Sequence, residues 1–283
     1  MNCLNLIKDL KNIPLYYRSM DLKSLFLFFK APFLVRRCIL YLNADFKTIG
    51  NKIIVNLRKY NGLYLYVDNI SNLLVILDVF FLTSYKIISN SKAIVIDIGL
   101  NIGASALFFS QYENIEHIYA FEPFKETYEQ AVDNLKLNKN LQNKITAYNY
   151  GLSDKEEIKN VLYSKKRSGS MSVMSDFYHS ELKVKDMHLS KVTLKAADKE
   201  ISNIISKTTN QIILKIDCEG SEYTIIDSLK KSGVLKDIDY ILLEWHFKGT
   251  DSILNTLKQN NFISFSLNDS NELSGMIYAV KCK

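Results

Sequence analysis

From residue 92 onward, short apolar runs alternate with amphipathic stretches. The apolar runs predict strands over 93–98, 118–121, 145–148, 212–216 and 240–243, and closing strands over 262–266 and 276–280. The stretches between them predict helices over 103–111, 125–137, 222–231 and 251–259. Strands that alternate with helices imply right-handed crossovers and a mostly parallel sheet that is covered on both faces. We therefore predict an α/β fold with a Rossmann-like, doubly wound, mostly parallel seven-stranded sheet.

The first 90 residues follow a different pattern, and we expect an N-terminal extension (1–90) ahead of the main domain (91–283). Two prolines interrupt residues 1–45, which predicts two or three short helices there. Asn61-Gly62 joins two β-rich runs at 52–57 and 63–67, a pattern typical of a hairpin. A helix over 72–89 is expected next. The extension is therefore predicted to be helical with one β-hairpin.

The interval 153–190 has no regular pattern that we can assign, and it includes the polar stretch 164–170. A loop of this length in a compact domain is usually functional and is often a lid. A surface excursion without function is the alternative.

The 283-residue chain carries a net charge of +6, most of it near the start. Residues 1–50 hold eight Lys or Arg side chains against three Asp, whereas the rest of the chain is almost balanced. A nucleic-acid-binding protein needs a basic patch in its body, so we expect no nucleic-acid partner. The basic start predicts either a peripheral contact with a membrane surface or another anionic partner, or a cap that covers apolar surface.

The four cysteines are scattered without CxxC spacing, which suits a reducing compartment. The apolar runs at 25–29 and 73–82 are far shorter than the ~20 residues that cross a bilayer. The first 20 residues lack the continuous apolar stretch of a signal peptide. We expect a cytoplasmic protein without a transmembrane segment.

The first candidate site lies at the junction of the strand at 93–98 and the helix after it, with the sequence Asp97-Ile-Gly99-Leu-Asn101-Ile-Gly103. Its glycines allow a tight turn and a close approach of the backbone to a ligand. The GxxxG spacing differs from the GxGxxG that cradles a dinucleotide pyrophosphate, which Asp97 would repel. An ammonium group suits that carboxylate, so S-adenosyl-L-methionine (SAM) fits as the cofactor. Simple packing of strand against helix is the alternative explanation for the glycine pair.

The second candidate is Glu122, which ends the next predicted strand and precedes Pro123. An acidic side chain about 20 residues after the glycine turn accepts hydrogen bonds from ribose hydroxyls. We expect Glu122 to bind the ribose of the cofactor.

Two further groups of polar residues end the strands at 212–216 and 240–243. Asp217 and Glu219 are candidate catalytic residues, while Glu222 can be merely a helix-starting acid. Glu244 and His246 follow the neighbouring strand, and a carboxylate or neutral imidazole there can act as a general base. A structural histidine is an equal alternative for His246. Carboxylates can also hold a divalent metal ion, although we favour a metal-free base.

The ordered motifs resemble those of FkbM-type methyltransferases over residues 90–245. The resemblance is carried by the Asp97–Gly103 motif, by Phe121-Glu122-Pro123, by Asn149-Tyr-Gly-Leu-Ser153-Asp154 and by Lys215-Ile-Asp217-Cys-Glu219-Gly220-Ser-Glu222. Weaker motifs lie at Ser170-Met171-Ser172 and at residues 192–198. The departures are Leu100, where the family has a small residue, and Ala197, where it has leucine. The resemblance implies a class I SAM-dependent methyltransferase that acts on a hydroxyl oxygen of a sugar or secondary metabolite.

We therefore expect a SAM-dependent O-methyltransferase with a small-molecule or glycan acceptor. The alternative is a catalytically silent SAM-binding scaffold protein in a glycan-assembly complex. Methylation of nucleic acid is disfavoured, because the motif after the strand at 212–216 is not the Asn/Asp-Pro-Pro-aromatic type used on exocyclic base nitrogens.

Overall fold

The computed structural model describes residues 39–50, 52–86, 89–164, 171–173, 187–268 and 273–282. The short helices predicted before residue 39 and the polar residues 165–170 lie outside the described residues. Most of the basic residues near the start of the chain also lie outside the described residues, so the role predicted for them stays a prediction.

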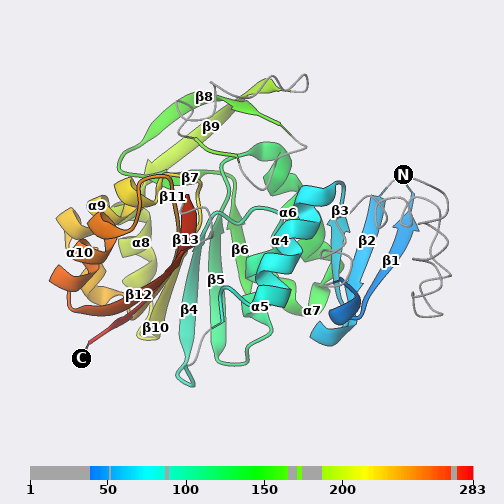
Figure 1. Ribbon diagram of the computed structural model, residues 1–283, viewed down its shortest axis with the longest axis horizontal. Coiled ribbons are helices and arrows are strands. Elements are labelled where there is room, and N and C mark those ends of the chain that lie inside the picture. The colour runs from blue at the N-terminus through cyan, green and yellow to red at the C-terminus, as the bar shows by residue number, and fades with distance from the viewer. Residues whose placement is uncertain are drawn as a thin grey trace.

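A seven-stranded sheet forms the centre of the molecule, in the order β12-β13-β11-β10-β4-β5-β6 (Figure 1). Five neighbouring strands are parallel: β4 (Ala93–Ile98), β5 (Ile115–Phe121), β6 (Ile145–Tyr148), β10 (Gln211–Ile216) and β11 (Tyr240–His246). The antiparallel strands β12 (Phe262–Asn268) and β13 (Ser274–Lys281) complete one edge. The predicted mostly parallel α/β sheet is confirmed.

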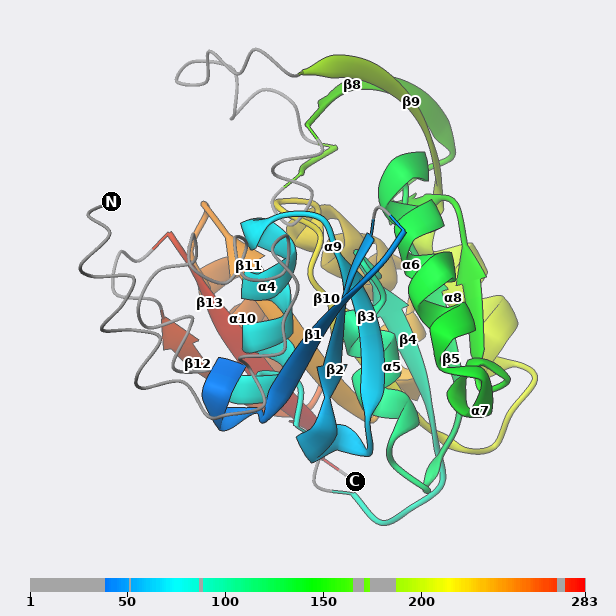
Figure 2. The same ribbon diagram turned by 90° about the vertical axis from the view of Figure 1, so that its right-hand side faces the viewer.

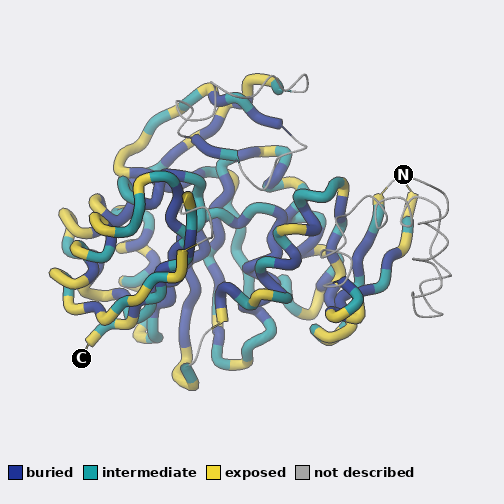
Figure 3. Tube along the Cα trace, in the orientation of Figure 1, coloured by how far each residue is buried: buried dark blue, intermediate teal, exposed yellow. Residues whose placement is uncertain are grey.

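Helices cover both faces of this sheet. One face packs against α4 (Ile70–Leu77), α5 (Ala104–Ser110), α6 (Lys125–Leu137) and the short α7 (Lys139–Gln142). The other face packs against α8 (Ala197–Ile205), α9 (Glu222–Ser232) and α10 (Asp251–Gln259). Every residue of β4 is buried, as expected of a central strand between two helical layers (Figure 3).

The extension contributes a separate three-stranded antiparallel sheet, β1 (Ala44–Ile49), β2 (Lys52–Leu57) and β3 (Leu63–Val67), seen face-on in Figure 2. A 3-10 turn over Arg58–Tyr60 and a left-handed Asn61 close the hairpin predicted between β2 and β3. The pattern did not predict β1. Buried side chains of this sheet and of β4 and β5 share one hydrophobic core.

The helix predicted over 72–89 begins earlier and ends earlier than expected. α4 continues as a π-helical turn over Asp78–Leu82 and stops at Thr83, whose φ is +56°. The Ser84 hydroxyl donates to the Asp78 carboxylate at 2.6 Å and holds this turn. The next residue, Tyr85, thereby enters the core and is only 1% exposed.

The prediction of an irregular loop over 153–190 is wrong, because the described part of this interval contributes strands to a third sheet. β7 (Gly151–Ser153), β9 (His188–Ala196) and β8 (Glu157–Tyr163) pair in the order β7-β9-β8, and β8 and β9 arch over the central sheet in Figure 1. Alternate apolar side chains of these strands, Val161, Tyr163, Val192 and Leu194, form a small core with Phe124. The period-2 pattern that marks a half-buried strand was therefore present in this interval.

Among the described residues, no helix is both long and apolar enough to cross a membrane.

Candidate active site

All the predicted site residues lie at the edge where the parallel strands β4, β5, β10 and β11 end. Parallel strands direct their carboxyl ends to one edge, so loops that are distant in the sequence become neighbours there. The pairing of β10 with β4 places Lys215 directly opposite Asp97, and the pairing with β11 places Ile216 opposite Leu243. The site therefore follows from strand order and register.

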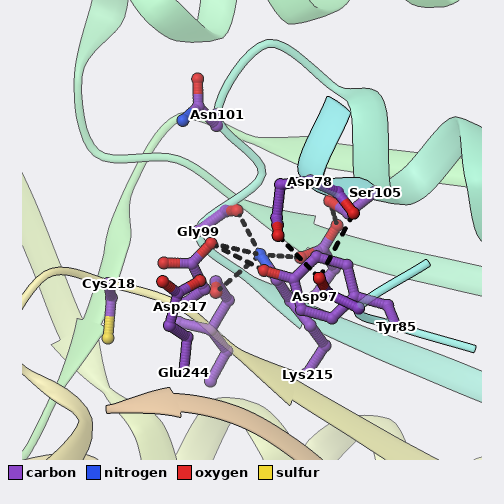
Figure 4. Close-up of polar contacts among 12 residues, drawn as sticks. Asp78, Tyr85, Asp97, Gly99, Asn101, Ser105, Lys215, Asp217, Cys218 and Glu244 are labelled. Atoms are coloured by element: carbon purple, nitrogen blue, oxygen red, sulfur yellow. Dashed lines mark hydrogen bonds and ion pairs between the residues drawn. The ribbon is translucent and has the colours of Figure 1, made fainter. Parts of the chain in front are cut away.

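A buried ion pair between Lys215 and Asp97 lies under the site. The Lys215 Nζ is 3.0 Å from the Asp97 Oδ1 and donates to the Gly99 carbonyl at 2.6 Å, while Ser105 donates to the Asp97 Oδ2 at 2.6 Å (Figure 4). Burial raises the pKa of Asp97, although Lys215 and Ser105 oppose that shift. Burial would lower the pKa of Lys215, but Asp97 and Asp217 raise it overall. Lys215 is therefore held as a cation.

These contacts change what Asp97 can do. Its side chain is fully buried and its two oxygens are directed to Lys215 and Ser105. In this arrangement Asp97 positions Lys215 and the loop at Gly99. The predicted direct contact between Asp97 and a cofactor ammonium stays a prediction.

The glycine loop packs against the loop after β10. A Cβ on Gly99 would lie 1.7 Å from the Asp217 carbonyl oxygen, so only glycine permits this approach of two backbones. Gly103, with a φ of +87°, begins α5 in a left-handed conformation. Two residues other than glycine, Asn101 and Glu219, also have φ near +50°. Such conformations are sparsely populated and cluster at functional sites.

Glu122 is held by two backbone N–H groups. Its Oε2 accepts from Asn101 N at 3.0 Å and its Oε1 accepts from Phe124 N at 2.9 Å. Burial raises its pKa to about 7, against the opposing effect of these hydrogen bonds. The Asn101 side chain accepts from Ile102 N and points away from the cluster around Lys215 (Figure 4). Glu122 is thus fixed at the wall of a cavity, where its remaining lone pairs can accept further hydrogen bonds.

Glu222 connects the β10–α9 loop to His246. Its carboxylate is fully buried and accepts from Cys218 N and Gly220 N, and it lies 3.0 Å from the His246 Nδ1. The His246 Nε2 lies 3.6 Å from Glu219 and 3.7 Å from Glu244. Burial alone would lower the pKa of His246, but the hydrogen bond to Glu222 and the charges of Glu219 and Asp217 raise it to about 10. His246 is therefore an imidazolium at neutral pH, which disfavours the general-base role that the sequence left open.

Asp217 and Glu244 form the other half of the cluster. The Tyr85 hydroxyl donates to the Asp217 Oδ2 at 2.9 Å, and the same oxygen is 3.7 Å from the Lys215 Nζ. Burial and the neighbouring Asp217 carboxylate raise the pKa of Glu244 well above its usual range, while His246 opposes the shift. A carboxyl group with a pKa of about 9 keeps its proton at neutral pH and releases it at mildly alkaline pH.

Two cavities meet at this cluster and share Gly99, Asn101, Asp217 and Glu219 as wall residues. The first is narrow, about 50 Å³, and Glu122, Gly151 and Leu152 line it. The second holds about 490 Å³ and lies between the cluster and α4, with Asp78 and Glu244 in its wall. The second has the size of a small-molecule site, whereas the walls of the first must separate to admit a nucleoside.

The donor atoms of Asp217, Glu219 and His246 lie within 4.8 Å of one another, a spacing that could hold a metal ion. A metal would have to displace the proton from His246, whose pKa is raised by three carboxylates. Proton and metal would thus compete for the same imidazole, and Asp217 and Glu219, two of the carboxylates that raise its pKa, would themselves be ligands of the metal.

The structure adds functional residues that the sequence reasoning missed. Lys215 and Tyr85 contact the acidic cluster, and Ser172 supports it by donating to the Glu219 carbonyl. The sequence leaves open whether Glu222 is a helix-starting acid, and the structure shows that it also contacts His246. A lysine inside an apolar strand could have suggested a buried ion pair, whereas Tyr85 carries no signal in its local sequence.

Comparison with known proteins places the chain in a family. Residues 97–264 match the model of the methyltransferase FkbM domain. No curated protein matches the chain.

Three similar solved structures are methyltransferases of low sequence identity. The first, methyltransferase FkbM from Methylobacillus flagellatus KT, has 15% identity and a TM-score of 0.47, over 75% of this chain and 55% of that one. The second, precorrin-6y C5,15-methyltransferase from Geobacter metallireducens GS-15, has 13% identity and a TM-score of 0.42, over 72% and 88%. The third, a putative tRNA (m1A22) methyltransferase from Streptococcus pneumoniae in complex with S-adenosyl-L-methionine, has 14% identity and a TM-score of 0.40, over 68% and 69%. This chain thus spans about half the length of the first of them.

The family model covers more than half of the chain and includes all nine predicted site residues, which confirms the resemblance seen in the motifs. The chain belongs to the FkbM-domain methyltransferases.

Proposed function

We propose that this protein is a SAM-dependent O-methyltransferase that methylates a hydroxyl group of a sugar, glycan or secondary metabolite. The observation that carries the proposal is the meeting of two cavities at Gly99, Asn101, Asp217 and Glu219. A methyl transfer needs a cofactor site and an acceptor site that share a wall, because the two reacting atoms must lie in line.

The residues of the narrow cavity suit the cofactor. Glu122 is fixed by two N–H groups and can accept hydrogen bonds from ribose hydroxyls. Asp217 and Glu219 lie where the cavities meet, and their charges favour the sulfonium and ammonium groups there. When bound, SAM supplies the methyl group.

The residues of the larger cavity suit a hydroxyl-rich acceptor. Asp78, Asp217 and Glu219 present carboxylate oxygens, which accept hydrogen bonds from hydroxyl groups, and a protonated Glu244 can both donate and accept. Leu74 and Leu82 provide an apolar wall opposite them. The concentration of acidic groups repels phosphate, which supports a sugar or metabolite over a nucleic acid as the acceptor.

Glu244 is the general base that we propose. It lies in the wall of the larger cavity, and its raised pKa makes its carboxylate a stronger proton acceptor than an ordinary glutamate. As the acceptor oxygen forms its bond to the methyl carbon and the bond from that carbon to the cofactor sulfur breaks, Glu244 would take the hydroxyl proton, and the cofactor would be left as a neutral thioether. His246, held by Glu222, positions Glu219 and Glu244 through its charge.

The catalytically silent scaffold remains the alternative, and catalysis separates the two functions. The cytoplasmic location stays a prediction from the cysteine pattern.

The test combines binding and turnover. We expect wild-type protein to bind S-adenosylhomocysteine (SAH) in calorimetry, and Glu122→Gln to weaken binding about tenfold to a hundredfold, because a hydrogen bond to a charged group is lost. With a panel of free sugars, SAH release should be measurable and should rise with pH as Glu244 ionises. Glu244→Gln should lower turnover by about 10²–10⁴-fold and leave SAH affinity nearly unchanged. The control is Glu156→Gln, an exposed glutamate outside the cavities.

Absence of SAH binding would refute the proposal. Binding without turnover of any sugar or small hydroxylated metabolite would favour the scaffold.

A further inference from the structure

Ser221 is a buried hydroxyl without a partner. It is 2% exposed, and its Oγ has no hydrogen-bond partner among the described residues. Two neighbouring polar side chains are engaged elsewhere: Thr224 donates to the Ser221 carbonyl at 2.8 Å, and Glu222 accepts from Cys218 N and Gly220 N. A buried hydroxyl that has given up water without gaining a partner is destabilising.

The usual role of such a serine does not apply here. Ser221 immediately precedes α9, where serine normally accepts a hydrogen bond from a backbone N–H of the first turn. That geometry needs an extended backbone, but Ser221 has φ −83° and ψ −5°, and its side chain makes no capping hydrogen bond. The backbone of this helix start therefore does not explain the hydroxyl.

Ser221 also belongs to the wall of a cavity, where a ligand could supply the missing partner. Ser221 lines the narrow cavity that also contains Glu122, Gly151 and Leu152. Most of the remaining wall is apolar, including Met171, Val173 and Leu194. A hydroxyl in such surroundings suits a flat, largely apolar ligand that carries a few hydrogen-bonding atoms, as a purine does.

We propose that the Ser221 hydroxyl hydrogen-bonds to the adenosine part of the cofactor. The inference rests on the proposed function, since it takes SAM as the ligand of this cavity. Glu122 on β5 and Ser221 at the start of α9 then hold the nucleoside from two separate elements. The unpartnered hydroxyl is retained because it gains its partner only when the cofactor binds.

The proposal predicts opposite effects on stability and on binding. Ser221→Ala removes an unsatisfied polar group, so the melting temperature of the free protein should stay the same or rise. The same change should weaken SAH binding about three- to tenfold, the equivalent of one neutral hydrogen bond. Ser221→Thr keeps the hydroxyl and should retain more of the affinity than Ser221→Ala.

The matched control is Thr224→Ala in the same helix turn. Thr224 is partnered within the protein and is not a cavity residue, so its loss should lower the melting temperature and leave SAH affinity unchanged. Both variants and wild type are compared as full chains by calorimetry with SAH and by thermal unfolding without it.

Two results would overturn the inference. One is Ser221→Ala binding SAH as tightly as wild type, and the other is a marked loss of stability in the free Ser221→Ala protein, which would reveal a partner within the fold. If wild-type protein fails to bind SAH, the proposed function fails first and takes this inference with it. The wild-type titration therefore distinguishes the two failures.

Discussion

The imidazolium of His246 should make the stability of this protein fall as pH rises above neutrality. Its pKa is about 10 in the folded protein, raised from 6.5 by hydrogen bonding to Glu222 and by the charge of Glu219, against the cost of burial. Between these two values the folded state holds a proton that the unfolded state has released. The free energy of unfolding therefore decreases with pH in this window.

The size of this decrease in the free energy of unfolding follows from the two pKa values of His246, in the unfolded and in the folded protein. The stabilisation is fully present below pH 6.5 and is lost as pH rises toward 10. From pH 6 to pH 8 the unfolded histidine loses most of its proton while the folded one keeps it, which removes about 2 kcal/mol of stability. Replacing the imidazole with a neutral amide that can still donate to Glu222 removes this contribution.

The assay is urea unfolding at pH 6 and pH 8 for wild type and His246→Gln. The fall in the free energy of unfolding should be about 2 kcal/mol smaller in the variant. The contribution of Glu244, whose pKa is also raised, has the same sign and remains in both proteins. His188→Gln is the control, because His188 lies in an exposed ion pair with Glu126. An equal fall in wild type and His246→Gln would refute the assignment of a buried imidazolium.

Two further predictions concern the buried ion pair between Lys215 and Asp97 and the close approach of backbones at Gly99. Lys215→Met should lower the free energy of unfolding by about 3–5 kcal/mol, because it leaves Asp97 buried without its cation. The double variant Lys215→Met/Asp97→Asn should recover part of that stability, because the buried carboxylate is then neutralised. Urea unfolding measures these changes, and a decrease below about 1 kcal/mol for Lys215→Met alone would show that the two residues are not coupled. Gly99→Ala should destabilise the protein more than Gly233→Ala in thermal unfolding, since both glycines have positive φ but only Gly99 would clash, with the Asp217 carbonyl. Equal losses would mean that the backbone conformation alone, worth ~1–2 kcal/mol, explains the glycine.

The sequence by itself determined the layers of the fold and the edge at which the site lies. The apolar runs at 93–98, 212–216 and 240–243 identified strands that are buried on both faces, because such strands need no alternation. Polar residues that directly follow such strands must gather at one edge, since parallel strands end together. This reasoning was sufficient to bring Glu122, Asp217, Glu219 and His246 to one place without knowledge of side-chain contacts.

Only the tertiary structure decided what each of these residues can do. The register of β4 against β10 set Lys215 opposite Asp97, and this pairing holds Asp97 in a buried ion pair that its local sequence does not show. Likewise, the fold brought Glu222 against His246 across 24 residues of sequence, and this contact raises the pKa of a histidine for which the sequence left a base and a structural role equally open. Protonation and availability depend on burial and on neighbours that are distant in the chain, so no local pattern of residues encodes them.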